Sequence, residues 1–223
     1  MRRTTLVTFF ILTVGAAGAS RGAAAAGPGV SVAPSAITAT GITPGAQVLF
    51  FGAGFEPKTY YAVVHRWSTV VADADMDGSV SYALDSPVTW NALWIVADLR
   101  TGRYAVASTP GFPVHRSALE RRDFKRDMTG GISRFVYSRS IVDFLYVSPG
   151  GAWTLQARDG ESTDGDSKVD GETAIDLSRL RPLLSGADVP RAFTPGGTLF
   201  IIDSSRLDLL ELKIDASILA GAR

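Results

Sequence analysis

Two acidic stretches of this 223-residue chain have the residue types and the spacing of calcium-binding loops. The first, Asp73-Ala74-Asp75-Met76-Asp77-Gly78, matches the D-x-D-x-D-G opening of such a loop. Alternate aspartates in a tight turn present several carboxylate oxygens, which are the ligands that Ca²⁺ prefers. The loop normally closes with a bidentate Glu at its twelfth position, where this chain has Leu84. The sequence therefore favours a plain polar hairpin turn, with a calcium site at Asp73, Asp75 and Asp77 as the alternative.

The second acidic stretch, residues 159–170, resembles the calcium loop of a dockerin. The register that this resemblance implies makes Asp164, Asp166 and Asp170 the ligands. The stretch departs from the dockerin pattern at the twelfth position, which is Thr173, and no second copy follows. A solvated acidic loop is the favoured interpretation. Calcium is the one cofactor that the sequence suggests, and both of its sites are alternatives to plainer structures.

The residues that commonly carry hydrolytic chemistry form no recognisable motif. The chain has no cysteine, which excludes thiolate nucleophiles, disulfides and cysteine-ligated metals. Residues 27–223 contain no Gly-x-Ser-x-Gly, His-Glu-x-x-His or Ser-x-x-Lys pattern, and the two histidines, His65 and His115, are far apart along the chain. We therefore predict that the protein is not an enzyme. An exported hydrolase with a non-standard site is the enzymatic alternative.

Aromatic residues suggest a binding site of another kind. The rings with faces that can stack on sugars include those of Tyr60, Tyr61, Trp67, Trp90, Trp94 and Trp153. Because large aromatic side chains are mostly core residues, burial is the expected role of most of them. Trp90 stands beside the polar Asn91, so it is the best candidate for an exposed, ligand-binding ring.

The charge balance excludes two classes of protein. Lys and Arg together number 22, as do Asp and Glu, and 46% of the residues are hydrophobic. This composition excludes a disordered chain and a polycationic nucleic-acid binder. The balance conceals a basic segment, residues 116–139 with a net charge of +4, and an acidic one, residues 159–176 with −6. Two solvated patches are the plainer interpretation, and docking of one segment on the other is the more specific hypothesis.

Residues 1–26 have the order of a secretory signal peptide. Arg2 and Arg3 are followed by an apolar run at residues 6–14 and by Ala-x-Ala sites that end at Ala19 and Ala26. The run is shorter than the roughly 20 residues of a spanning helix, so we expect no transmembrane span after cleavage. Cleavage after Ala26 leaves 19 basic and 22 acidic side chains. The predicted location is outside the cytoplasm: secreted, periplasmic or on the cell surface.

The body of the chain has the residue pattern of an all-β protein. Short apolar stretches alternate with Gly, Pro, Asp and Ser clusters from residue 30 onward. About six or seven strands are expected before residue 108, a number typical of an immunoglobulin-like sandwich. Strands are also predicted at residues 198–202 and 210–214, the last with its charges facing water, and one short helix at residues 173–184.

This pattern predicts two folded domains after the signal peptide at 1–26. The first is an Ig-like β-sandwich at 27–115, followed by a basic, helix-compatible linker at 116–130. The second is a smaller, mainly-β domain with one short helix at 131–223. A single enlarged sandwich is the alternative, because the length of the chain does not exclude it.

Residues 42–48 (ITPGAQV) combine a Gly-containing turn with an apolar strand, and the run Gly52-Ala53-Gly54-Phe55-Glu56-Pro57 follows. Together they resemble the opening of bacterial Ig-like domains of the IPT/TIG type. The resemblance covers about residues 30–113 and implies a β-sandwich with a spacer, interdomain or surface-binding role. We expect Gly52 and Gly54 to mark a bulge or turn between strands, since a phosphate-binding loop requires a following helix.

The sequence therefore predicts a secreted, non-enzymatic β-sandwich protein that serves as a cell-surface or extracellular binding, adhesion or structural module. The expected partner is an extracellular protein or a carbohydrate, and not nucleic acid. The alternatives are a calcium-stabilised carbohydrate- or protein-binding module and an exported hydrolase.

Overall fold

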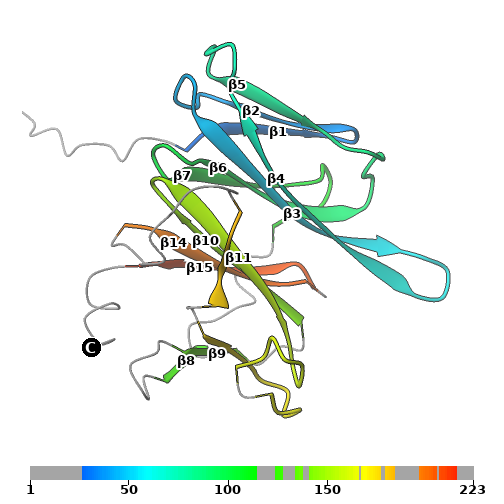
Figure 1. The fold of residues 1–223 in the computed structure, drawn as a ribbon. Coiled ribbons are helices and arrows are strands. Elements are labelled where there is room, and N and C mark those ends of the chain that lie inside the picture. The colour runs from blue at the N-terminus through cyan, green and yellow to red at the C-terminus, as the bar shows by residue number, and fades with distance from the viewer. Residues whose placement is uncertain are drawn as a thin grey trace, which may run out of the picture.

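The structure is a computed structural model that describes residues 27–114, 124–127, 134–137, 141–165, 167–176, 179–183, 196–204 and 206–214. The protein is all-β, as the sequence predicts, and its antiparallel strands lie in stacked sheets (Figure 1). Within the described ranges, no helix is long and apolar enough to cross a membrane.

The N-terminal half forms two antiparallel sheets. A three-stranded sheet has the order β1-β2-β5, and a four-stranded sheet has the order β4-β3-β6-β7. The strands are β1 (Gly29–Ala33), β2 (Ala36–Thr40), β3 (Gln47–Pro57), β4 (Ala62–Ala72), β5 (Ser79–Ala83), β6 (Asn91–Asp98) and β7 (Arg103–Ser108). The chain crosses from one sheet to the other between β4 and β5, at the first acidic stretch.

The C-terminal half contributes a five-stranded sheet of order β13-β11-β10-β14-β15 and a small three-stranded sheet of order β12-β9-β8. The strands are β8 (Phe124–Asp127), β9 (Arg134–Tyr137), β10 (Ile141–Ser148), β11 (Gly151–Arg158), β12 (Thr173–Asp176), β13 (Arg181–Pro182), β14 (Thr198–Asp203) and β15 (Asp208–Lys213). The strands predicted near residues 198–202 and 210–214 are thus confirmed as β14 and β15.

The four-stranded sheet is a middle layer. One of its faces packs on the three-stranded sheet, through a buried cluster that includes Val48, Phe50 and Val80. The opposite face packs on the five-stranded sheet, through a cluster that includes Phe51 and Phe200. Figure 1 shows the three layers one beside the next. Because successive strand residues point to opposite faces, β3 is apolar without alternation over most of its length.

The glycines of β3 make room for tryptophan rings. β3 continues without interruption through Gly52 and Gly54, so the bulge or turn expected there is wrong. A Cβ atom on Gly52 would lie 2.5 Å from Cζ3 of Trp94, and one on Gly54 would lie 2.8 Å from Cζ3 of Trp67. Side-chain carbons do not approach that closely, so glycine is the residue that lets the two indole rings lie against the strand.

One cluster of buried side chains contains residues from both halves of the chain. Leu49 comes from β3, Leu145 from β10 and Phe200 from β14, and all three are fully buried. A polar contact crosses the same interface, since Nε of Arg66 on β4 lies 3.0 Å from Oδ1 of Asp143 on β10. The predicted boundary near residues 116–130 separates the sheets but not this core. The division into two independent domains stays a prediction.

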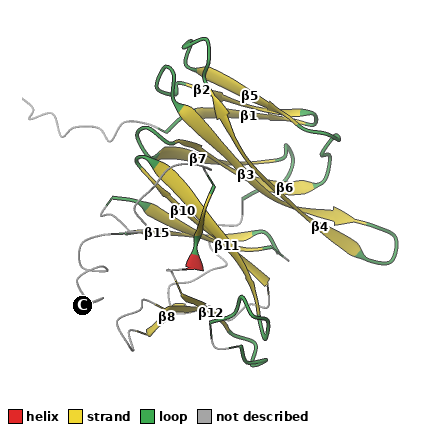
Figure 2. Cartoon of the chain, in the orientation of Figure 1, coloured by secondary structure: helices red, strands yellow, loops and turns green. Residues whose placement is uncertain are grey.

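The short helix predicted at residues 173–184 is wrong for the described part of that segment. β12 pairs with β9, and β13 pairs with β11. Arg179 alone has 3₁₀-helical geometry among the described residues of this segment. Figure 2 draws the neighbouring β12 as a strand. The linker at 116–130, which is compatible with helical turns by sequence, contains the strand β8. Its other residues, 116–123 and 128–130, lie outside the described ranges. Pairing with distant strands outweighs the weak local pattern.

The small sheet brings together the two oppositely charged segments. β8 and β9 belong to the basic segment and β12 to the acidic one. In the register of β9 and β12, Arg134 stands opposite Asp176. The two segments are therefore joined by strand pairing within the chain, and docking driven by their opposite charges stays a prediction.

Candidate functional site

An aromatic cleft lies at the end of the four-stranded sheet where β6 begins. The cleft has a volume of about 530 Å³ and is lined by Phe55, Glu56, Pro57, Thr89, Trp90, Asn91 and Phe112. The strand register creates it, because Phe55 pairs with Asn91, the first residue of β6, and the end of β3 extends beyond that pair. Rings and polar groups from three separate segments therefore border one opening. The volume is within the range of small-molecule sites, roughly 300–1,000 Å³.

Glu56 is an ionised acceptor in this lining. Its Oε1 accepts a hydrogen bond from Nζ of Lys58, and its Oε2 lies 2.9 Å from Nε2 of His65. The hydrogen bond from Lys58, followed by that of His65, lowers the pKa of Glu56 below its ordinary value of 4.5. The carboxylate is therefore charged at neutral pH and suited to accept hydrogen bonds from hydroxyl or amide groups of a ligand.

A row of rings connects the cleft with the core. The His65 ring lies 5.4 Å from that of Trp90 and stacks on Trp67 at 5.6 Å, measured between centroids. Trp67 in turn lies 5.0 Å from Trp94, which is fully buried. The Trp90 ring of the cleft is thus supported from behind by a stack that reaches the core, an arrangement that limits its freedom to reorient.

The sequence singled out Trp90 as an exposed ring, and this expectation is wrong, because the side chain is half-buried and packs against the core while it lines the cleft. Its Nε1 is buried and has no hydrogen-bond partner among the described residues. The role of Trp90 as a ligand contact stays a prediction. Sequence reasoning missed Phe55, Glu56 and Phe112 as lining residues, because only the pairing of β3, β6 and β7 brings them to the same opening.

The other aromatic candidates divide between core and surface. Trp94 and Trp153 are buried, as expected for most of these rings. Tyr60 and Tyr61 lie in the turn between β3 and β4 and are 94% and 66% exposed. The turn begins directly after Pro57, a lining residue, so these two rings follow the cleft lining along the chain.

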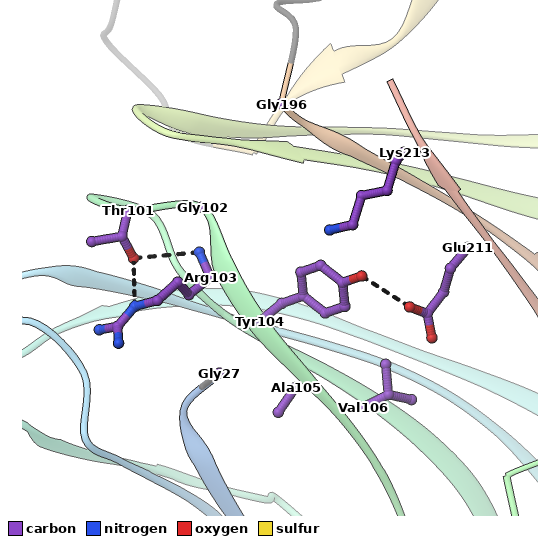
Figure 3. A pocket seen from close by; sticks show the side chains of 10 residues that line it. All are labelled: Gly27, Thr101, Gly102, Arg103, Tyr104, Ala105, Val106, Gly196, Glu211 and Lys213. Atoms are coloured by element: carbon purple, nitrogen blue, oxygen red, sulfur yellow. Dashed lines mark hydrogen bonds between the residues drawn. The ribbon is translucent and has the colours of Figure 1, made fainter. Parts of the chain in front are cut away.

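A second cleft, of about 490 Å³, lies between β7 and β15 (Figure 3). Tyr104 points from β7 toward β15, and its hydroxyl donates to Oε2 of Glu211 at 2.9 Å. Nζ of Lys213 lies 4.6 Å from the centroid of the Tyr104 ring and donates to Oγ1 of Thr198 at 2.8 Å. The expectation that both charges of the last strand face water is thus wrong for half-buried Glu211. The side chains of Tyr104, Glu211 and Lys213 thus contact one another, and the cleft marks a polar contact between two sheets.

The first acidic stretch forms a corner, and the predicted hairpin is wrong. β4 and β5 belong to different sheets, so the stretch between them carries the chain from one layer to the next. The structure brings together Asp73, which is buried, with the exposed Asp75 and Asp77. One carboxylate oxygen from each lies within 4.8 Å of the others. Metal binding by these three residues stays a prediction.

The second acidic stretch does not assemble a comparable group among the described residues. Asp164 is buried, and its Oδ2 accepts a hydrogen bond from the N–H of Gly160 at 3.0 Å. Asp170 is exposed and accepts from the N–H of Glu172 at 2.9 Å. Asp166 lies outside the described residues. Calcium binding by this stretch stays a prediction.

Comparison with protein-family models and with curated proteins finds no match for this chain. The resemblance of residues 30–113 to IPT/TIG domains therefore stays a prediction.

Proposed function

We propose that this protein is an exported, non-enzymatic binding module that holds a carbohydrate chain in the aromatic cleft. The observation that carries the proposal is the lining, in which the rings of Phe55, Trp90 and Phe112 border the same opening as Glu56 and Asn91. Aromatic faces pack on the apolar faces of sugar rings, while carboxylate and amide groups bind sugar hydroxyls. A small number of polar groups in an aromatic cleft is the usual composition of a small-molecule site.

The surroundings of the cleft favour an extended ligand over a single sugar. Pro57 lines the cleft, and the exposed rings of Tyr60 and Tyr61 follow within four residues. A saccharide chain that leaves the cleft over Pro57 meets these two rings. The exported location in the proposal rests on the signal-peptide pattern of residues 1–26.

The contact between His65 and Glu56 favours a second candidate, an exported hydrolase. Glycoside hydrolysis commonly uses two carboxyl groups on either side of the scissile bond. Glu56 is the one carboxylate among the described residues that line the cleft, and its lowered pKa suits an acceptor better than a proton donor. His115, the other histidine, lies outside the described residues. The lining thus supports binding better than hydrolysis.

The test is binding of residues 27–223 to an array of immobilised polysaccharides, followed by calorimetric titration with a soluble oligosaccharide of the bound type. Replacing Trp90 by Ala removes a stacking face, so we expect affinity to fall about tenfold or more, equivalent to about 1.4 kcal/mol. Trp90→Phe keeps a ring and serves as the matched variant, with a smaller expected loss. Glu56→Gln tests the acceptor.

Several outcomes contradict the proposal. Equal affinity of Trp90→Ala and the unmodified protein would place the ligand elsewhere, provided that both melt at the same temperature. Release of new reducing ends from a bound polysaccharide, abolished by His65→Ala, would establish the hydrolase instead. An array without any bound saccharide would also reject the carbohydrate assignment.

A further inference from the structure

The corner between β4 and β5 brings three carboxylates close together. In the part of the chain that the structure describes, no Lys, Arg or His forms an ion pair with Asp73, Asp75 or Asp77. Arg100 reaches this corner, but its guanidinium donates to the backbone carbonyls of Pro44 and Gly45. Like charges this close repel one another, most strongly where water is excluded.

Asp73 has one carboxylate oxygen that is buried and unused. The residue is only 3% exposed. Its Oδ2 accepts hydrogen bonds from the N–H groups of Gly45 and Gly78, at 3.0 and 3.1 Å. Its Oδ1 is buried and accepts no hydrogen bond from any described residue. A charged buried acceptor without a partner costs free energy of folding. A hydrogen-bond donor or a cation at this oxygen would remove that cost.

The surroundings of this oxygen offer further oxygen ligands. Asp73 and Asp75 line a small cavity of about 260 Å³ together with Ser79 and Ser81. Asp77 accepts a hydrogen bond from the N–H of Ser79 at 2.7 Å through Oδ1, which fixes the carboxyl group in place. Carboxylate, hydroxyl and backbone oxygens are the ligands of hard cations. The lining contains no His or Cys.

We propose that Asp73, Asp75 and Asp77 bind one Ca²⁺ ion, with water completing its shell. Ca²⁺ accepts six to eight oxygens in a flexible arrangement, whereas Mg²⁺ requires a near-ideal octahedron and gives up its water reluctantly. A surface turn with one buried and two exposed carboxylates fits the more permissive ion. The ion neutralises the repulsion and gives Oδ1 of Asp73 its missing partner.

The position of the site makes the ion structural. β3 and β4 pair from Gln47 opposite Ala72 to Pro57 opposite Ala62, and the acidic corner adjoins the first of these pairs. The aromatic cleft adjoins the other end of the same strands, about 30 Å away at the rise of a strand. Bound Ca²⁺ therefore stabilises the crossing between two sheets without contacting the cleft. This inference does not depend on the proposed carbohydrate function.

The experiment is a thermal melt of residues 27–223 in about 5 mM CaCl₂ and in excess EGTA, with isothermal titration of CaCl₂ alone, at a concentration chosen for the weak affinities of extracellular calcium modules. For a Kd of about 10⁻⁴–10⁻³ M this concentration is about 5–50 times the Kd, so we expect calcium to raise the Tm by about 2–9 °C. The double variant Asp75→Asn/Asp77→Asn should lose both the shift and the calorimetric signal. Because Asp75 and Asp77 are exposed, the variant should fold in EGTA like the unmodified protein.

Asp85→Asn is the matched control, because Asp85 is exposed and lies outside the cluster. Its response to calcium should equal that of the unmodified protein. The proposal fails if calcium neither shifts the Tm nor gives a titration signal. It also fails if the double variant responds like the control, since the ion would then bind elsewhere. An equal response to MgCl₂ would overturn the assignment to calcium.

Discussion

At the scale of single residues, a buried carboxylate fixes the turns that frame the four-stranded sheet. Oδ2 of the fully buried Asp98 accepts from the N–H and the hydroxyl of Thr43, at 3.0 and 2.6 Å. Its Oδ1 accepts from the N–H groups of Arg100 and Thr101. Burial by itself would raise the pKa of Asp98, but the hydrogen bonds from Thr43 and Thr101 outweigh it and hold the pKa below 3.8. The side chain therefore remains ionised in the folded protein.

Replacing Asp98 by Asn should destabilise the fold by about 2 kcal/mol at pH 7, because hydrogen bonds to a charged acceptor are lost. The folded-state pKa is below the unfolded value, so the contribution of Asp98 is present above about pH 4 and disappears as the pH falls through the folded pKa. Urea unfolding at pH 7 and at lower pH checks this. The difference between the two proteins should shrink on acidification. A constant difference would show that the carboxylate charge is irrelevant.

At the scale of elements, an ion pair joins β4 of the middle sheet to β10 of the five-stranded sheet. Arg66 contacts the fully buried Asp143, which also takes hydrogen bonds from Ser204 and Gln156. Burial raises the pKa of Asp143 above 3.8 although Arg66 and the hydrogen bonds act in the opposite direction. Unlike Asp98, this group contributes most below pH 3.8, and its contribution is lost as the pH rises through the folded pKa.

Arg66→Ala should cost about 3 kcal/mol at pH 7, because it leaves a buried carboxylate without its cation. Asp143→Asn in the same chain should restore much of that loss by removing the unpaired charge. Urea midpoints of the single and double variants form the double-mutant cycle that measures this coupling. Equal midpoints for Arg66→Ala and for the double variant would assign the loss to packing of the Arg66 side chain. Its Cζ lies 5.2 Å from the centroid of the Phe51 ring.

At the scale of the whole molecule, the stacking of three sheets makes the halves of the chain interdependent. The middle sheet packs on another sheet at each face, and the fully buried Leu49, Phe51 and Ile95 belong to the cluster shared with the five-stranded sheet. Each fully buried aliphatic or aromatic side chain is worth about 1.5–3 kcal/mol. Exposing several of them would consume the 5–15 kcal/mol that stabilises a typical domain.

A fragment of residues 27–114 should therefore fail to fold like the intact protein, although the predicted first domain ends at residue 115. We expect the fragment to bind a hydrophobic dye and to melt without a cooperative transition, whereas residues 27–223 melt in one step. Differential scanning calorimetry of both proteins measures this. A fragment with the Tm of the intact chain would instead support two independent domains.

The strands were predictable where local composition and burial agree. Residues 198–202 (TLFII) are all β-branched or apolar, and they form β14. β12 was mistaken for helix because its strand identity depends on β9, which lies some forty residues earlier in the chain. Gly52 and Gly54 signalled an unusual backbone environment, but the reason lies in Trp94 and Trp67, which reach them from other strands.

The candidate sites divide in the same way. The sequence identified Asp73, Asp75 and Asp77, because consecutive turn residues stay close together in any fold that keeps the turn. It also singled out Trp90 from its polar neighbour. It did not identify Glu56 or Phe112, since a cleft depends on which strand ends meet.

The sequence by itself determined an all-β protein without cysteine chemistry, with an acidic turn and an aromatic residue suited to ligands. Those properties follow from composition and from contacts only a few residues apart. The tertiary structure decided that the sheets share a core, that the acidic stretch is a corner between sheets, and that three segments of the chain border an aromatic cleft. Strand register and layer order decide such features, and both arise from contacts between residues far apart in the chain.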